Sequence, residues 1–189
     1  LGLNIDFGVF TAYFIAGLYK FLNFFSSSIT IEFANVVYPT IATVVAAIFL
    51  FLLVRRLFDY RVALLSSLFL VTLPVFLFRS ISSDHDILGL MFVFMTLYFF
   101  VAGWEAKKKL NHILFGVLAS FTTLLGFHTA GNIKIFVMIV AMFLLVHILF
   151  GKVKESDFYV YPVWYIVTYG FMLISGKLGI GSILSDFTS

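Results

Sequence analysis

The stretch Val36–Val54, VVYPTIATVVAAIFLFLLV, contains no charged residue and lies between Asn35 and Arg55. A helix needs about 20 apolar residues to cross a hydrocarbon core of roughly 30 Å. Two further uncharged runs follow, Val62–Phe78 and Ile87–Gly103. Because backbone polar groups in lipid must be satisfied within the segment itself, these three runs predict membrane-spanning helices.

The rest of the chain continues this pattern, with more apolar runs separated by short polar loops. Three of them are expected to span as well, at Ile113–Phe127, Ile135–Phe150 and Phe158–Ser175. The first of these is short, so we expect residues near His112 and His128 to complete it. Together the runs predict about six spans.

The N-terminal run, Phe7–Phe25, differs from the others. It contains Lys20, has Asp6 and Asn23 near its ends, and is rich in aromatic residues. It is apolar enough to span, but an amphipathic helix at the outer membrane surface is the alternative, and we favour the latter.

Composition supports a membrane protein with almost no soluble part. Of 189 residues, 62% are hydrophobic and only 11% are charged, which does not fit a water-facing surface. The absence of cysteine rules out disulfides and thiolate metal sites. The formal charge of +3 does not predict nucleic-acid binding, because the basic residues are spread over short loops. Since Leu1 is not an initiator methionine and no signal peptide is evident, we expect a part of a larger protein.

Basic residues predict the orientation. The loops RRLFDYR, EAKKKLNH and GKVKESD contain eight of the 12 lysines and arginines. The intervening loops contain only Arg79, Lys134 and Lys177. Because basic loops stay in the cytoplasm, the first set is expected there and the second set outside. The protein is therefore predicted to be a multi-pass protein of the cell membrane.

One outside loop, Phe78–Asp86, has a higher density of charged and titratable side chains than any other part of the sequence. It contains Arg79, Asp84, His85 and Asp86. Two carboxylates separated by one residue can converge on a hard divalent cation such as Mg²⁺ or Mn²⁺, which in turn can neutralise a lipid-linked phosphate or pyrophosphate.

A structural explanation of this loop is equally available. Ser83 and Asp86 have the spacing of a capping box at the start of the next helix, and the helix dipole favours acidic residues there. Arg79 could simply pair with Asp84.

Other polar and aromatic groups are less specific. His128 and Asn132, in GFHTAGNIK at another outside turn, could line a cavity or simply end a helix. Tyr159, Tyr161, Trp164 and Tyr165 fit an aromatic belt at the membrane surface.

The run Leu64–Leu90, LLSSLFLVTLPVFLFRSISSDHDILGL, resembles the catalytic subunit of oligosaccharyltransferase, especially the archaeal and bacterial single-subunit enzymes. In that family a basic loop leads into a span ending in P-x-x-x-x-R-S, followed by an external D-x-D. The counterparts here are Pro74, Arg79 and Ser80, then Asp84-His85-Asp86. The resemblance covers roughly residues 2–174, although only this region is specific. GFHTAGNIK stands where the family has a W-G-G-Y type turn.

The resemblance implies a polytopic all-α bundle of the C-type glycosyltransferase kind. It implies transfer of a glycan from a polyprenyl or dolichyl phosphate or pyrophosphate to asparagine in N-x-Ser/Thr. Asp84 and Asp86 would be catalytic and would hold Mg²⁺ or Mn²⁺, and we take Arg79, His128 and Asn132 as candidate substrate-binding residues. The expected partners are the lipid-linked oligosaccharide, the acceptor polypeptide, membrane lipid and the remainder of the parent chain. Residues 1–35 would belong to the first extracytoplasmic loop, with its interfacial helix, and residues 36–189 to the transmembrane domain.

The sequence also departs from the family. The first external acidic motif, the later T-I-x-E-like loop and the W-W-D motif that binds the acceptor are all absent. Two alternatives therefore stay open: another C-type glycosyltransferase that uses a polyprenyl-phosphate sugar, and a non-catalytic membrane scaffold. A transporter would need polar groups inside its spans, and we expect none in the three clearest runs.

Overall fold

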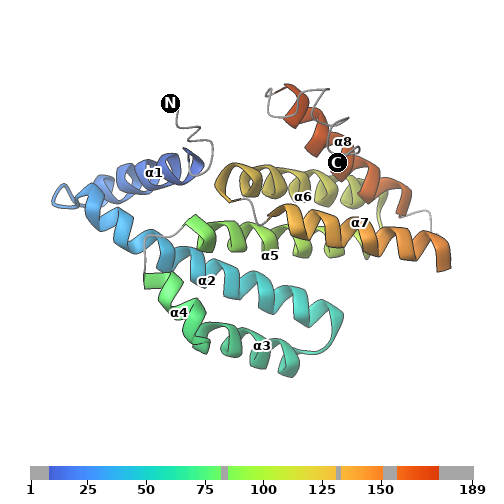
Figure 1. Cartoon of the computed structure of the whole chain (residues 1–189), viewed down its shortest axis with the longest axis horizontal. Coiled ribbons are helices and arrows are strands. Elements are labelled where there is room, and N and C mark those ends of the chain that lie inside the picture. The colour runs from blue at the N-terminus through green and yellow to red at the C-terminus, as the bar shows by residue number, and fades with distance from the viewer. Residues whose placement is uncertain (1–8, 82–84, 131–132, 151–156, 175–189) are drawn as a thin grey trace, which may run out of the picture.

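The chain folds into packed helices. The computed structural model describes residues 9–81, 85–130, 133–150 and 157–174, and every regular element within these ranges is a helix (Figure 1). In chain order they are α1 (Val9–Phe25), α2 (Ile31–Leu57), α3 (Tyr60–Thr72), α4 (Pro74–Ile81), α5 (His85–Trp104), α6 (Lys109–Thr129), α7 (Ile133–Phe150) and α8 (Asp157–Ile174). The helices α2, α5, α6 and α7 run along the long axis of the molecule (Figure 1).

Most of the predicted apolar runs each form one helix. In the described part of the chain, α2, α5 and α6 are long and apolar enough to cross a membrane. Helix α6 includes both His112 and His128, so the extension expected for that run is confirmed. The number of spans and the surface position of α1 stay predictions.

The run Val62–Phe78 does not form the single helix that we predicted. It divides at Leu73, whose φ of −62° and ψ of 124° are those of extended backbone. The residue before a proline is driven out of helical geometry by the proline ring, whereas proline itself suits the first position of a helix. Pro74 therefore ends α3 and begins α4, which turns back toward α2 (Figure 1).

Helix α5 lies at the centre of the bundle, packed against α2 and α6. One core cluster joins Tyr38 and Ala42 of α2 to Ile87 and Leu88 of α5, and Phe76 of α4 packs into it. This cluster holds the end of α4 and the first turns of α5 together.

Two glycines bring α8 close to α5 and α6. A Cβ atom at Gly116 would lie 3.1 Å from Cγ1 of Val163 and 3.2 Å from the carbonyl oxygen of Val160. A Cβ atom at Gly103 would lie 3.2 Å from Cγ1 of Val160. Small residues at such crossings allow helices to approach closely in membranes, where dispersion contacts replace the hydrophobic effect.

The bundle interior contains more polar groups than expected. Thr96 Oγ1 and Thr122 Oγ1 lie 2.9 Å apart, and Thr123 Oγ1 donates to the carbonyl oxygen of Ala119 at 2.7 Å. Trp164 is only 2% exposed, so it belongs to this interior and not to a surface belt as predicted. These hydroxyls bond to one another and to helix carbonyls, so they join helices and do not open a polar pathway.

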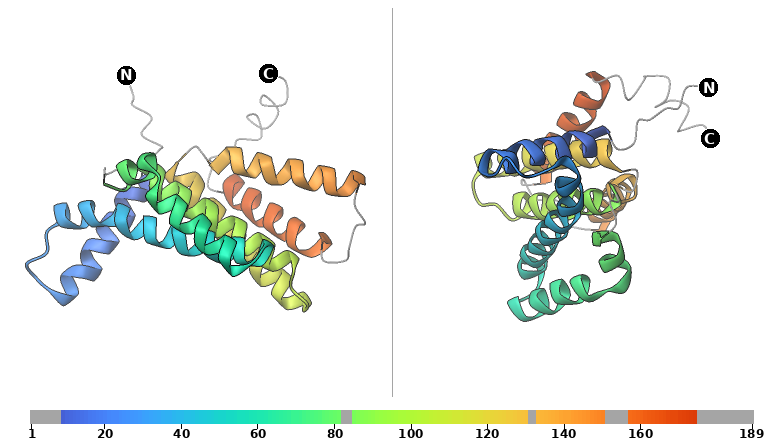
Figure 2. Two further views of the ribbon diagram at one scale, coloured as in Figure 1. Left: turned by 90° about the horizontal axis from the view of Figure 1, so that it is seen from below. Right: turned by 90° about the vertical axis from the view of Figure 1, so that its left-hand side faces the viewer.

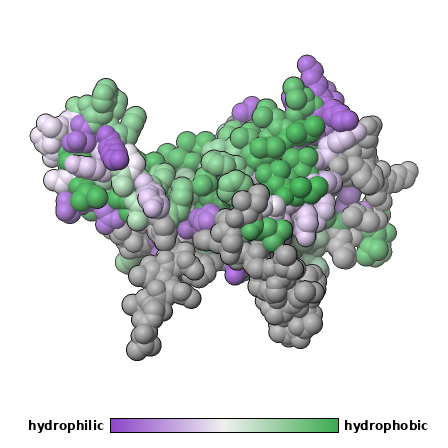
Figure 3. Space-filling view, turned by 90° about the horizontal axis from the view of Figure 1, so that it is seen from above, coloured by the Kyte–Doolittle hydropathy of each residue, from purple (hydrophilic) through white to green (hydrophobic). Residues whose placement is uncertain are grey.

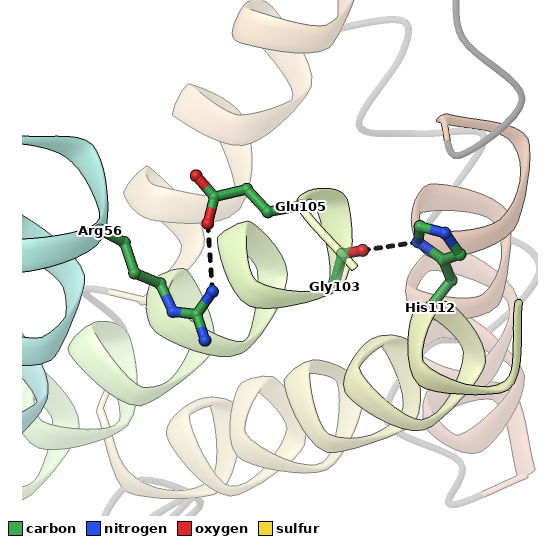
Figure 4. Close-up of polar contacts among 4 residues, drawn as sticks. All are labelled: Arg56, Gly103, Glu105 and His112. Carbon is green, nitrogen blue, oxygen red and sulfur yellow. Dashed lines mark hydrogen bonds and ion pairs between the residues drawn. The ribbon is translucent and has the colours of Figure 1, made fainter. Parts of the chain in front are cut away.

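Two of the basic loops meet at one end of the bundle, as their alternation predicts. Arg56 Nη1, at the end of α2, lies 3.1 Å from Glu105 Oε2, just after α5 (Figure 4). His112 Nδ1, in the first turns of α6, lies 2.6 Å from the carbonyl oxygen of Gly103 (Figure 4). The third loop, at 151–156, lies outside the described residues. We call this end of the bundle the basic end.

The surface agrees with a lipid environment. Hydrophobic atoms cover the middle of the face in Figure 3, and hydrophilic atoms gather mainly toward its two ends. Large apolar side chains point outward on several helices, among them Phe121 of α6, Met142 of α7 and Ile166 of α8. In water such a surface would drive aggregation, whereas in a bilayer it is the surface that lipid requires.

Candidate functional site

The end of α4 and the start of α5 lie at the end of the bundle opposite the basic end (Figure 1). Arg79 is in the last turn of α4, and Asp86 is in the first turn of α5. The side chains of His85 and Asp86 are 51% and 38% exposed, with His85 Nε2 at 3.9 Å from Asp86 Oδ1. Asp84, the other predicted ligand, lies outside the described residues. The structure thus leaves the Asp86 carboxylate accessible at a helix N-terminus, where the helix dipole favours negative charge.

Buried residues immediately after Asp86 fix this helix end. Ile87 and Leu88 are almost completely buried, and they pack with Tyr38 of α2. Phe76 brings α4 onto the same cluster. The polar first turn of α5 is therefore supported by a packed apolar layer, which fixes the backbone at this end of the helix.

The C-terminal end of α6 lies at the same end of the bundle (Figure 1). A Cβ atom at Gly126 would lie 3.4 Å from the Cβ of Phe92, and Phe92 follows Asp86 by about 9 Å along α5 at 1.5 Å per residue. His128, half-buried in the last turn of α6, follows Gly126 closely. The structure therefore brings two of the predicted site residues, Asp86 and His128, to one end of the bundle.

The last turn of α6 is held by hydrogen bonds to its own carbonyl groups. The Ala130 amide donates to the Gly126 carbonyl oxygen at 2.9 Å, and Thr129 Oγ1 donates to the Leu125 carbonyl oxygen at 2.7 Å. Ala130 is 1% exposed. Asn132, the other residue predicted here, lies outside the described residues. Gly126, which the sequence analysis did not single out, permits the close packing of this turn.

Helix α1 covers part of this end with aromatic rings. The rings of Phe10 and Phe92 are 5.7 Å apart, and those of Phe14 and Tyr38 are 6.5 Å apart, both in edge-on geometry. Such pairs are favoured by the ring quadrupoles and exclude water. The sequence analysis missed this contact, because an aromatic-rich helix predicts a membrane surface as readily as a partner helix.

The described part of the site offers the type of ligand that a hard divalent cation prefers. Asp86 offers carboxylate oxygens, which Mg²⁺ and Mn²⁺ prefer, and its side chain is accessible. Within the ranges that the structure describes, no three His, Cys, Asp or Glu side chains lie close enough to form a ligand set. Asp84 falls outside those ranges, so the pairing of the two aspartates stays a prediction.

Comparison with known families identifies the family of the chain. The sequence model of the family described as "Oligosaccharyl transferase STT3, N-terminal" matches residues 1–183. The chain belongs to the STT3 family. Neither the comparison with curated proteins nor the comparison with solved structures gave a match.

STT3 membership confirms the family resemblance, and the matched residues 1–183 agree with the extent expected from the sequence, roughly residues 2–174. It fits the helical fold and the apolar helices of the structure. The chain is thus a membrane-embedded relative of the oligosaccharyltransferases. The Asp84–Asp86 segment stays the candidate site predicted from the sequence.

Proposed function

We propose that this chain forms part of an oligosaccharyltransferase that moves a glycan from a polyprenyl or dolichyl phosphate or pyrophosphate carrier to asparagine in N-x-Ser/Thr. The observation that carries the proposal is the STT3 family match over residues 1–183. The packing of α1, α4, α5 and α6 around one end of the bundle supports it. That end has an accessible carboxylate on a rigid apolar base, which suits a reaction at a membrane surface.

In this proposal Asp84 and Asp86 hold Mg²⁺ or Mn²⁺ at the start of α5. The cation supplies positive charge that positions the acceptor amide and offsets the charge of the departing phosphate. The chain's own part is to present the carboxylates. Burial of Ile87 and Leu88 fixes the first turn of α5, and so limits the movement of Asp86.

Three further residues are proposed to bind the donor. Arg79 at the end of α4 would contact its phosphate groups, since a guanidinium matches phosphate geometry with paired hydrogen bonds. His128 and Asn132 would contact the donor from the α6–α7 turn. The loop is proposed to face the extracytoplasmic side of the cell membrane, where the acceptor polypeptide emerges.

Substitution of the two aspartates tests the proposal in the full-length parent protein. Asp84→Ala and Asp86→Ala are each expected to abolish glycan transfer to an N-x-Ser/Thr peptide, with normal membrane insertion. The matched control is Asp59→Asn at the basic end. Asp59 caps α3 through Oδ1, which accepts from the amides of Arg61 and Val62 at 2.9 Å, and asparagine can make the same bonds.

Wild-type transfer in either Asp84→Ala or Asp86→Ala would contradict the proposed roles. A fall in transfer that matches a fall in the amount of folded protein would assign Asp86 to helix capping. Loss of transfer in Asp59→Asn would show that removing a carboxylate far from the site also abolishes transfer. That result would count equally against a specific role for Asp84 and Asp86.

A further inference from the structure

A groove runs between α2 and α3 on the lipid-facing side of the molecule. Its volume is about 370 Å³, and it is lined by Thr43, Val44, Ala47, Ile48 and Phe51 of α2 and by Ser67, Leu68 and Val71 of α3. Helix α3 packs mainly on α2 and projects from the rest of the bundle (Figure 2). The groove is therefore open along one side.

The groove walls suit hydrocarbon rather than water. Thr43 Oγ1 donates to the carbonyl oxygen of Pro39 at 2.8 Å, and Ser67 Oγ donates to that of Ala63 at 3.0 Å. Both hydroxyls are thus satisfied within their own helices, and the remaining lining side chains are apolar. Water needs two or more polar partners to occupy such a site, and these walls do not provide them.

The groove has room for a hydrocarbon chain. The residues from Thr43 to Phe51 extend about 12 Å along α2 at 1.5 Å per residue, and the groove volume is about 370 Å³. A hydrocarbon chain is an occupant whose chemistry matches these walls.

Arginines continue both walls of the groove toward the basic end. Arg55 follows Phe51 by one helical turn on α2, and Arg61 precedes Leu68 by two turns on α3, so each lies on the groove face of its helix. Their side chains are exposed. At 1.5 Å per residue, they stand about 6 and 9 Å beyond the end of the groove.

Neither of these two arginines forms an ion pair among the described residues. Glu105 pairs with Arg56, which faces α5 and stands over the ring of Tyr98 at 5.2 Å. Asp59 uses Oδ1 to cap α3. The Arg61 side chain contacts that of Tyr60.

We propose that the α2–α3 groove binds an anionic phospholipid from the leaflet at the basic end. One acyl chain lies along Ala47 and Leu68, and the phosphate is bound by Arg55 and Arg61. An apolar channel that ends in two exposed guanidinium groups without an ion pair among the described residues matches a lipid with an anionic headgroup. This site is distinct from the Asp84–Asp86 loop at the opposite end, and it does not depend on glycan transfer.

Lipid binding to the purified full-length protein tests the proposal. The probes are phosphatidylglycerol and phosphatidylcholine with identical acyl chains, and bound lipid is measured by native mass spectrometry. Phosphatidylglycerol is expected to bind at least tenfold more tightly. Arg55→Gln and Arg61→Gln should each weaken its binding about fivefold, because each basic side chain near the headgroup contributes a similar factor. Ala47→Phe, which fills the groove, should weaken binding of both lipids.

Matched variants show whether the effects are specific. Lys107→Gln removes an exposed charge from another loop at the same end, and Ala141→Phe adds a ring to the exposed face of α7. Both should bind phosphatidylglycerol as the wild type does. Equal binding of the two lipids to the wild type, unchanged binding in Ala47→Phe, or a fivefold loss in Lys107→Gln would each overturn the proposal. So would a groove closed by another helix of the parent protein, in which case neither lipid binds there.

Discussion

Trp164 Nε1 of α8 donates a hydrogen bond to Thr123 Oγ1 of α6 at a distance of 2.9 Å. The same tryptophan accepts, through its carbonyl oxygen, a hydrogen bond from Ser120 Oγ at 3.0 Å. Its ring also meets that of Phe100 of α5 edge-on, 5.6 Å apart. One residue thus connects α8 to both α5 and α6, through polar and aromatic contacts together.

We expect Trp164→Phe to destabilise the folded protein by about 1–2 kcal/mol. The substitution removes one interhelical hydrogen bond, worth about 0.6–1.7 kcal/mol in membrane proteins, and leaves a small cavity. Thermal unfolding in detergent measures the change. Tyr165→Phe is the matched control, because Tyr165 is substantially exposed and its hydroxyl makes no hydrogen bond to a described residue. Equal loss in both variants would contradict a specific role for the indole N–H.

The stability cost of substituting Gly126 is expected to depend on the side chain of Ile133. A Cβ atom at Gly126 would lie 2.8 Å from Cδ1 of Ile133, so Gly126→Ala should cost about 1–3 kcal/mol through overpacking. Ile133→Val removes that Cδ1 atom, and the double variant should recover much of the loss relative to the two single variants.

The control for this cycle is Gly170→Ala, since a Cβ atom there has nothing within 4 Å. It should be neutral or slightly stabilising, because alanine favours helix more than glycine does. Additive effects of Gly126→Ala and Ile133→Val would mean that the two positions do not share this contact.

The helices were predictable from hydropathy, whereas their packing was not. Uncharged runs such as Val36–Val54 and Ile87–Gly103 became α2 and α5, because lipid leaves a backbone little alternative to helix. The break at Leu73 was predictable in principle, since Pro74 disfavours helix at the preceding residue. We did not predict it, because prolines are often tolerated within membrane helices.

Contacts within the bundle depend on which face of each helix turns inward. A run that is apolar all round has no strong amphipathic signal, so the sequence did not indicate that Thr96 of α5 and Trp164 of α8 would both face α6. Spacing of small residues such as Gly116 and Gly126 was the available signal for close approach. The candidate site was different, because the density of charged residues at Arg79–Asp86 singled it out without any packing information.

Sidedness can be measured with single cysteines, because the chain has none of its own. Lys107→Cys lies in a basic loop and Lys134→Cys at the start of α7. A membrane-impermeant maleimide applied to intact cells should label Lys134→Cys and should label Lys107→Cys only after permeabilisation. This follows because basic loops stay in the cytoplasm. The opposite labelling would place the Asp84–Asp86 loop in the cytoplasm, and labelling of both sites in intact cells would contradict the alternating topology.

Metal chelation and the Asp86→Asn variant together show whether Asp86 is a metal ligand or only stabilises the N-terminus of α5. If Asp86 only favours the N-terminus of α5, Asp86→Asn should lower the free energy of unfolding by about 0.3–1 kcal/mol and leave glycan transfer intact. If it holds a divalent cation, EDTA should abolish transfer by the full-length wild type, and Mn²⁺ or Mg²⁺ should restore it. Asp86→Asn should then need at least tenfold more Mn²⁺ for half-maximal transfer, because a neutral amide is a weaker ligand than a carboxylate. If the Mn²⁺ concentration for half-maximal transfer is unchanged in this variant, Asp86 is not a metal ligand and only favours the N-terminus of α5.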